Sequence, residues 1–145
     1  MIRRNMKKIV LLAVLVLMSA AAGFAQKKMY EPKKGSPERQ TLADAIRSYD
    51  TLRNSALKGE IFGVNAMQVQ GDWAFASVER TNLPDAGQGT LLAFLRRSGG
   101  SWKVIWSDYN DNGEVGVDAL KRLRKRYRDF SKQLADFAEN GYLAG

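Results

Sequence analysis

Apolar residues recur at intervals of three and four in the segment that follows Gly35, which is the spacing of one face of an α-helix. Ser36 and Pro37 are typical of a helix start, because a serine hydroxyl can accept a hydrogen bond from the first turn and proline suits the first helical position. Lys58 and Gly59 indicate where this helix ends. The face that we expect to be buried consists of Leu42, Ala45, Ile46, Tyr49, Leu52 and Ala56.

After this helix the apolar period changes to two, which predicts strands joined by glycine-containing turns. The first strand carries a phase slip near Asn65 and Ala66 that indicates a β-bulge. Residues 70–72 and 98–100 are the predicted hairpin turns, and residues 81–89 are a predicted loop. Four antiparallel strands are predicted at residues 62–69, 73–78, 90–97 and 102–107.

Large and small residues alternate in the second strand, where Trp73 and Phe75 share one face and Ala74 and Ala76 share the other. An amphipathic helix needs an apolar sheet face to cover. We therefore expect the first helix to pack on large side chains of the sheet. The predicted contacts run from Leu42, Ile46 and Tyr49 to Trp73 or Phe75 and to Trp102 or Val104.

A second helical period runs from Val117 to Ala138, and Asn140-Gly141 is typical of a helix end. The predicted fold class is therefore α+β: an N-terminal helix packed on a four-stranded antiparallel meander sheet, followed by a long C-terminal helix. The spacing of the last helix is also heptad-like, so a homodimer formed through it is an alternative use of its apolar stripe. That stripe consists of Leu120, Leu123, Tyr127, Phe130, Leu134 and Phe137.

Three short patterns combine turn glycines, paired tryptophans and arginines in a fixed order, over about residues 35–106. The first is GSPERQTLADAIR, residues 35–47. The others consist of Phe62, Val64, Met67, Val69, Gly71, Trp73, Ala74 and Phe75, and of Leu92, Leu95, Arg96, Arg97, Gly100, Trp102 and Val104. Together they resemble a group of small uncharacterised exported bacterial domains. The resemblance implies a fold similar to the nuclear transport factor two-like and cystatin-like α+β proteins, in which a curved antiparallel sheet wraps a helix, and it implies no activity.

The first residues of the chain have the order of a secretory signal peptide. Positive charges precede an apolar run, and the small-residue sequence Gly23-Phe24-Ala25 follows it. We expect cleavage after Ala25 and a periplasmic or secreted protein. An uncleaved membrane anchor is the alternative, but the apolar run is shorter than the ~20 residues that span a bilayer.

The predicted organisation is a signal peptide at residues 1–25, a flexible lead-in at 26–34, a single α+β domain at 35–141 and a tail at 142–145. The chain has no cysteine, so its fold cannot depend on disulfides and it offers no thiolate nucleophile or lipid-bearing cysteine. A mature chain of about 120 residues is long enough to build one core of its own.

The net charge of +8 falls to +4 if the signal peptide removes Arg3, Arg4, Lys7 and Lys8. For an exported chain we expect no nucleic-acid partner, and anionic lipid or cell-wall polymers stay open as alternatives. The chain has no histidine, which excludes Ser-His-Asp triads and histidine-ligated zinc sites. We expect no cofactor.

The segment DYNDNGEVGVD, residues 108–118, begins like a calcium-binding loop, with oxygen-bearing side chains at alternating positions and glycine at the sixth. The twelfth position, which carries a bidentate acid in such loops, is Ala119. We therefore favour the alternative, a strand-to-helix turn built from Asn, Asp and Gly, and predict no tight calcium site. The candidate metal ligands are Asp108, Asn110, Asn112 and Asp118.

Six positive charges fall within KRLRKRYR, residues 121–128. One interpretation is a surface that contacts anionic lipid, cell-wall polymer or an acidic protein. The alternative, which we favour, is a solvated helix face whose cations are partly paired with acids elsewhere, with Leu123 and Tyr127 turned toward the core. The residues named for an anionic contact are Lys121, Arg122, Arg124, Lys125 and Arg128.

Two further sets of residues are candidate ligand-binding groups. Three tryptophans in the strands could form a stacking platform, although large aromatic residues there are more typical of core and cross-strand packing. Arg39 and Arg47 lie two turns apart on the first helix and could hold an anion together, but pairing with carboxylates such as Asp44 is the simpler interpretation. The tryptophans are Trp73, Trp102 and Trp106.

Acid-base catalysis would have to use Glu60, Glu79, Asp108 or Tyr109, and no spacing among them selects a pair. We therefore predict a small exported, non-catalytic binding or interaction module whose ligand is a small molecule or a protein. The alternative is a degenerate enzyme of the same fold that uses Asp or Glu and Tyr in a sheet pocket.

Overall fold

The computed structural model describes residues 27–53, 62–80 and 89–141. Its elements are helix α2 (Pro37–Arg53), strands β1 (Phe62–Gln70), β2 (Trp73–Arg80), β3 (Thr90–Ser98) and β4 (Ser101–Asn110), helices α3 (Val117–Arg126) and α4 (Lys132–Asp136), and the π-helical turn η3 (Phe137–Gly141). Four predicted segments lie outside the described residues. They are the signal peptide, the end of the first helix, most of the loop at residues 81–89, and the C-terminal tail.

The four strands form one antiparallel sheet in the order β1-β2-β3-β4, as predicted. Two tight turns connect the outer pairs of strands, β1 to β2 and β3 to β4. Gly71 has a φ of 60° between Gln70 and its partner Trp73, and Gly99 and Gly100 have φ of 59° and 80° in the β3–β4 turn. Positive φ in two-residue turns matches the twist of the strands, which is why glycine occupies these positions. Both predicted hairpin turns are confirmed.

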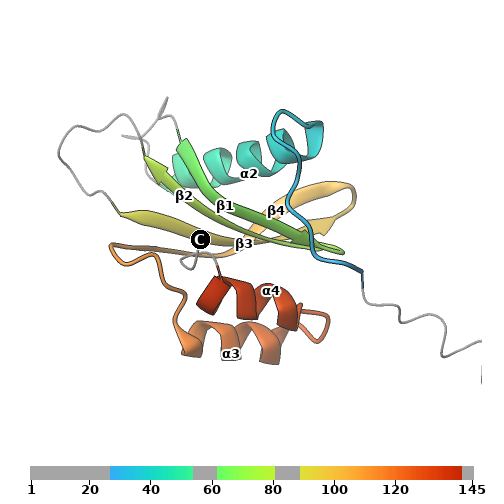
Figure 1. Cartoon of the computed structure of the whole chain (residues 1–145), viewed down its shortest axis with the longest axis vertical. Coiled ribbons are helices and arrows are strands. Elements are labelled where there is room, and N and C mark those ends of the chain that lie inside the picture. The colour runs from blue at the N-terminus through green and yellow to red at the C-terminus, as the bar shows by residue number, and fades with distance from the viewer. Residues whose placement is uncertain (1–26, 54–61, 81–88, 142–145) are drawn as a thin grey trace, which may run out of the picture.

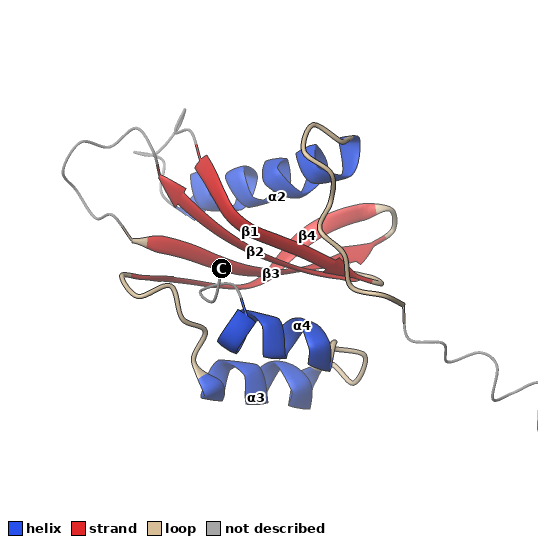
Figure 2. Cartoon of the chain, viewed as in Figure 1, coloured by secondary structure: helices blue, strands red, loops and turns tan. Residues whose placement is uncertain are grey.

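The protein has three layers, with the sheet in the middle (Figure 1). Helix α2 covers one face, and α3 and α4 lie together over the other, as Figure 2 also shows. The α+β class with a four-stranded antiparallel sheet is therefore confirmed. The prediction of one long C-terminal helix is wrong, because the chain forms two short helices and a final π-helical turn over this second face.

The break between α3 and α4 has a local cause. Tyr127 ends α3 in an extended conformation with φ −122° and ψ 107°, and Ser131 caps α4 by accepting a hydrogen bond from the Leu134 amide at 3.0 Å. The Ser131 hydroxyl also donates to Gln70 Oε1 in β1. Because the apolar spacing continues through the break, the sequence pattern alone does not distinguish one helix from two.

The face under α2 is lined by small and aliphatic side chains. Leu42 and Ile46 of α2 pack with Ala74 and Ala76 of β2. Our prediction that Trp73 or Phe75 would contact this helix is wrong, because both point to the other face. The predicted contacts with Trp102 and Val104 are confirmed. Tyr49, the third helix residue for which we predicted contacts, accepts a 3.1 Å hydrogen bond at its Oη from the Ser107 hydroxyl.

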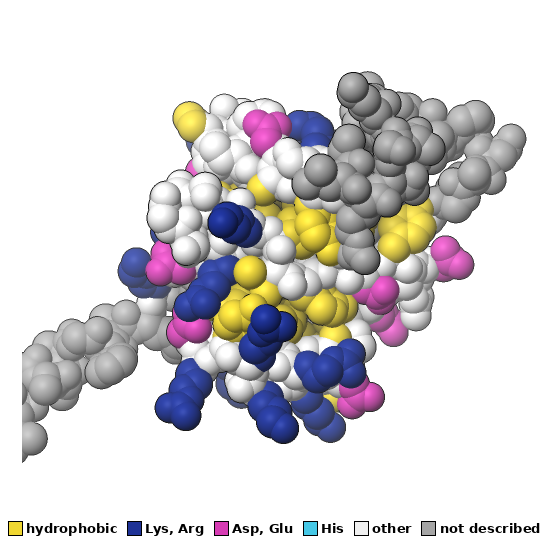
Figure 3. Space-filling model, turned by 180° about the vertical axis from the view of Figure 1, so that it is seen from behind, with side chains coloured by type: hydrophobic (Ala, Val, Ile, Leu, Met, Phe, Trp, Pro, Cys, Tyr) yellow, Lys and Arg dark blue, Asp and Glu magenta, His cyan; other side chains and the backbone are white. Residues whose placement is uncertain are grey.

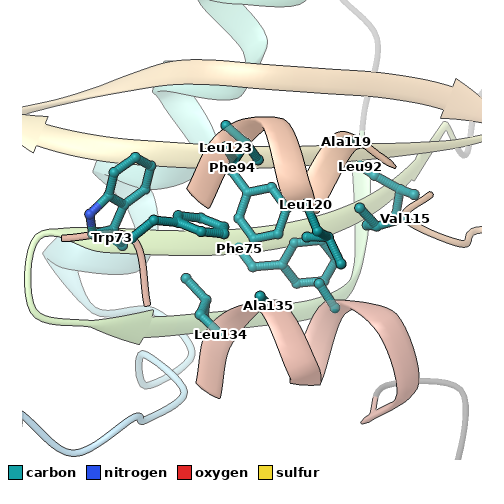
Figure 4. Close-up of a cluster of buried hydrophobic side chains, with 12 residues drawn as sticks. Trp73, Phe75, Leu92, Phe94, Val115, Ala119, Leu120, Leu123, Leu134 and Ala135 are labelled. Carbon is teal, nitrogen blue, oxygen red and sulfur yellow. The ribbon is translucent and has the colours of Figure 1, made fainter. Parts of the chain in front are cut away.

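The opposite face is built from aromatic rings (Figure 4). The ring centroids of Phe94 and Phe130 lie 5.1 Å apart, and those of Trp73 and Phe130 lie 4.9 Å apart, in edge-to-face geometry. Such pairs add to the stabilisation that burial of their apolar area provides. The buried members of this cluster are Trp73, Phe75, Leu92, Phe94, Val115, Ala119, Leu120, Leu123, Phe130, Leu134, Ala135 and Ala138.

Each edge strand of the sheet contains a bulge. In β1 the register shifts between Val64 and Ala66, which confirms the predicted phase slip. In β4 the register shifts as well, because Val104 pairs with Leu95 while Trp106 pairs with Phe94. Ile105 is therefore an extra residue, and β4 changes the face to which its large side chains point. The sequence analysis did not predict this second bulge.

The lead-in segment, described from Lys27 onward, lies against the edge of the sheet. Tyr30 and Val69 exchange backbone hydrogen bonds of 2.9 and 2.8 Å. The Tyr30 hydroxyl donates to Glu38 Oε1 at 2.8 Å, which connects the lead-in to the first turn of α2.

Among the described residues, no helix is long and apolar enough to cross a membrane.

Candidate functional site

A small groove of about 180 Å³ lies between β4 and α3. Its apolar lining includes Ile105 and Trp106 from the strand and Tyr127 just after the helix, all of them only partly buried. Arg122 and Arg126 line the same groove. The space-filling view from behind shows hydrophobic surface with Lys and Arg side chains gathered around it (Figure 3).

Two local features of the sequence create this groove. The bulge in β4 turns Ile105 and Trp106 toward the α3 side of the sheet, whereas Val104 faces α2. On α3, Arg122 and Arg126 are four residues apart and therefore lie one turn above the other on the same side. The groove thus combines an apolar floor from the strand with a pair of cations from the helix.

Cation–π contacts hold several of these side chains in place. The guanidinium of Arg126 lies 5.5 Å from the centre of the Tyr127 ring, and that of Arg96 lies 5.4 Å from it. Arg96 also lies 5.3 Å from the centre of the Trp73 ring and donates to Asp129 Oδ2 at 2.9 Å. The Tyr127 ring at the groove is therefore contacted by two guanidinium groups.

The basic face of α3, which we define as the six cations of residues 121–128 on this helix and in the turn after it, is exposed throughout. In the described part of the chain the one ion pair of this face is a 3.5 Å contact between Arg124 and Asp136. Five of the six cations thus lack an acidic partner there. Leu123 is buried and Tyr127 packs against the aromatic core, which confirms that both are turned toward the core. The prediction that the cations are partly paired with acids holds for Arg124 among the described residues.

A larger open cavity of about 430 Å³ lies between the β1–β2 turn and the α3–α4 turn. Its inner polar groups bond to one another: Gln70 Nε2 donates to the Lys27 carbonyl at 2.8 Å, and Trp73 Nε1 donates to Asp129 Oδ2 at 3.2 Å. Its charged side chains are three cations and two acids, so the two signs largely compensate each other. They are Lys27, Asp72, Arg128, Asp129 and Lys132.

The structure does not bring the three predicted tryptophans together. Trp102 lies on the α2 face, whereas Trp73 and Trp106 lie on the face that α3 and α4 cover. Trp73 is buried, and Trp106, which is partly exposed, reaches the groove. A shared stacking platform is therefore not formed, and Trp106 is the member that a ligand could touch.

The two arginines of α2 bind separate carboxylates. Arg39 donates to Glu31 Oε1 at 3.0 Å and to the Pro32 carbonyl at 2.9 Å. Arg47 donates to Asp44 Oδ1 at 3.0 Å, as we predicted. The structure therefore does not assemble Arg39 and Arg47 into one anion site.

The loop of residues 108–118 uses its oxygen atoms to hold its own backbone. Asp108 accepts hydrogen bonds from the Tyr109 amide and from Asn110 Nδ2, both at 2.9 Å. Asn110 Oδ1 accepts from the Gly113 amide at 2.7 Å, and Gly113 has a φ of 66°. These bonds are those of a strand-to-helix turn. Among the described residues, no three acidic side chains are grouped to hold a metal ion, and Asn112 and Asp118 are exposed.

The three acid-base candidates that the structure describes do not converge in an enclosed cavity. Glu79, Asp108 and Tyr109 are exposed, and Tyr109 Oη accepts a 3.0 Å hydrogen bond from the Gly89 amide. Glu60 lies outside the described residues. Away from these residues, the pKa of Tyr30 is raised by partial burial, by the hydrogen bond to Glu38 and by the charge of that carboxylate, against a lowering effect of Arg97.

Sequence reasoning identified the cations but missed the groove. Arg126 and Tyr127 were not named as site residues, although Arg122 and Arg126 at a spacing of four, beside Leu123 and Tyr127, were a visible signal. The position of Ile105 depends on the β4 bulge, for which the sequence gives no local signal.

The chain matches no family model, no curated protein and no solved structure.

Proposed function

We propose that this protein is an exported, non-catalytic binding module that holds an anionic partner on the basic face of α3. The observation that carries the proposal is the set of five exposed cations without an acidic partner in the described part of the chain. Four arginines elsewhere in the described part of the chain do have such partners: Arg39, Arg47, Arg96 and Arg97 each bind a carboxylate. A patch of uncompensated charge attracts partners of opposite sign and speeds their association.

Binding without chemistry is supported by how the sheet is covered. Both of its faces are filled by helices and buried side chains, with cores that contain Ile46 on one side and Phe94 on the other. An enzyme of the kind that we considered needs acid-base groups held together in a water-excluded site. The two described acids that the sequence offered, Glu79 and Asp108, are exposed instead.

Location and kinship are part of the same proposal. We infer export from the predicted signal peptide, and sequencing the N-terminus of material recovered outside the cytoplasm tests it. A terminus at Gln26 is expected, and Met1 or Met6 at the terminus would contradict it. The resemblance to nuclear transport factor two-like and cystatin-like proteins stays a prediction, supported by the antiparallel sheet with a helix on one face.

The binding proposal is tested by retention of the purified protein on immobilised polyglutamate as the salt concentration rises. Replacing Lys121, Arg122, Lys125 and Arg128 by glutamine should weaken retention by about tenfold or more, since each exposed charge contact contributes roughly 0.2–1 kcal/mol. Binding by the unchanged protein should itself fall with salt, because exposed charges are screened.

The control removes the same number of charges elsewhere. Lys27, Lys28, Lys33 and Lys34 are exposed. The carbonyls of Lys27 and Lys33 accept hydrogen bonds, and a glutamine would keep both of them. Their replacement by glutamine should change retention by less than about threefold. Equal losses in the two variants, or no retention of the unchanged protein, would contradict the proposal.

A further inference from the structure

We propose that the groove between β4 and α3 binds one apolar side chain of an acidic peptide segment, whose carboxylates pair with Arg122 and Arg126. This inference rests on the proposed function and specifies its partner. The lining supplies both halves of the contact: Trp106 and Tyr127 offer partly exposed aromatic surface, and the two arginines offer cations at the same groove.

The size of the groove selects the kind of occupant. Its volume of about 180 Å³ is well below the roughly 300–1,000 Å³ of pockets that enclose whole small-molecule ligands. A groove of this volume is suited to a single large side chain. A peptide that inserts one side chain and lies along the surface would use it fully.

The residue types at the groove are those that dominate binding energy at protein interfaces. Trp, Tyr and Arg are enriched among such residues. Arg126 is already held against the Tyr127 ring, so less conformational entropy is lost when it pairs with a carboxylate. Neither Arg122 nor Arg126 has an acidic partner among the described residues, which leaves both available to a carboxylate of the peptide.

Two other occupants fit less well. A membrane surface would need apolar side chains of α3 turned outward, but Ala119, Leu120 and Leu123 are buried against the sheet, and Val117 is the large apolar residue of α3 that is exposed. Addition of a partner strand to the edge of β4 is disfavoured by the bulge at Ile105, since bulges twist an edge away from regular pairing.

The test uses two synthetic peptides of equal charge, with glutamates on both sides of one phenylalanine or of one serine. Calorimetric titration of the purified protein should give a dissociation constant for the phenylalanine peptide about tenfold or more below that for the serine peptide. Burial of one aromatic side chain is sufficient for a difference of that order.

Paired variants locate the site. Replacing Arg122 and Arg126 by glutamine should weaken the phenylalanine peptide about tenfold and remove most of its advantage over the serine peptide. Replacing Lys121 and Lys125, which are exposed on the same helix but do not line the groove, should cost less than about threefold. Both variants lose two charges, and their unfolding midpoints should stay within a few degrees of the unchanged protein.

The outcomes separate this inference from the proposed function. Equal binding of the two peptides, or equal losses in the two variants, would overturn the groove inference and leave a diffuse anion-binding surface. Binding to vesicles that contain phosphatidylglycerol, with no binding of either peptide, would also overturn it in favour of a lipid surface. If neither the peptides, polyglutamate nor the vesicles bind, the proposed function fails together with the inference.

Discussion

Under α2 the two central strands present alanines and aliphatic side chains, whereas under α3 and α4 the same strands present aromatic rings. Ala76 on the first face and Phe75 on the second are neighbours in sequence. Small residues allow a single helix to lie close to the sheet. The large rings on the opposite face pack against side chains from both short helices, Leu120 and Leu123 of α3 and Leu134 of α4 among them.

The difference also explains where a binding groove can form. Among the described residues, the α2 layer packs on the sheet through a core of mostly small and aliphatic side chains, with Trp102 as its one aromatic member. The aromatic layer is less complete at its β4 side, where Trp106 and Tyr127 remain partly exposed beside α3. The face with the larger side chains is therefore the one that leaves apolar surface accessible.

The largest effect is expected from Phe94→Ala. Phe94 is fully buried and its ring lies close to those of Phe75 and Phe130. Truncation should reduce the free energy of unfolding by about 3–5 kcal/mol, because it removes the packing of both neighbours and leaves a cavity. Urea unfolding measures this, and a loss below about 1 kcal/mol would contradict the central role of the aromatic face.

A somewhat smaller loss, about 2–4 kcal/mol, is expected for Ile46→Ala on the aliphatic face, where Ile46 is 1% exposed. The control is Arg124→Ala, which removes an exposed 3.5 Å ion pair and should cost less than about 1 kcal/mol. Thermal unfolding of the two variants compares them directly. If both melted at the same temperature, our assignment of the α2 face as a core would be wrong.

The close approach of α2 is tested by enlarging a side chain beneath it. Ala76→Leu should cost about 1–3 kcal/mol, because the added atoms force the helix or the sheet to move. The adjacent Ser77 pairs with Leu92 and so lies on the aromatic face, where its buried hydroxyl has no hydrogen-bond partner among the described residues. Ser77→Ala should therefore be neutral or slightly stabilising in the same urea titration. The reverse order of the two stabilities would show that α2 tolerates large residues.

The smallest effect concerns Tyr30, which joins the lead-in to α2. Its pKa is raised above the ordinary value near 10 by burial and by Glu38. The folded state therefore favours the neutral phenol, so this contribution to stability is complete below about pH 10 and is lost as the pH rises through the raised pKa. Between about pH 9 and 12 the unchanged protein should lose more stability than Tyr30→Phe. Parallel pH profiles would exclude the effect.

Local signals in the sequence predicted the local structure. Ser36 accepts the Arg39 amide at 3.2 Å as a helix cap, the glycine turns set both hairpins, and the phase slip near Asn65 is a bulge. The predictions that were wrong concern contacts between residues far apart in the chain. Alternation in β2 separates Trp73 from Ala74 but does not state which of them α2 covers.

The candidate site was predictable only in part, for the same reason. The cations of residues 121–128 are plain in the sequence, and their exposure follows from the apolar stripe of α3. The groove needs the β4 bulge and the break before Ser131, and the buried contact of Ser131 with Gln70 supports that break. Neither feature has a strong local pattern in the sequence. The helical period of residues 117–138 even continues through the break.

Each strand of the sheet pairs with its neighbour in sequence, so the β1–β2 and β3–β4 hairpins can form without closing a long loop. Such local topology lowers the entropic barrier to folding. The hydrogen bond between Ser131 and Gln70 instead joins residues 61 positions apart and can form only when the C-terminal helices dock. We expect refolding to begin with the hairpins and to end with this docking, so that the aromatic rings leave water in the last step.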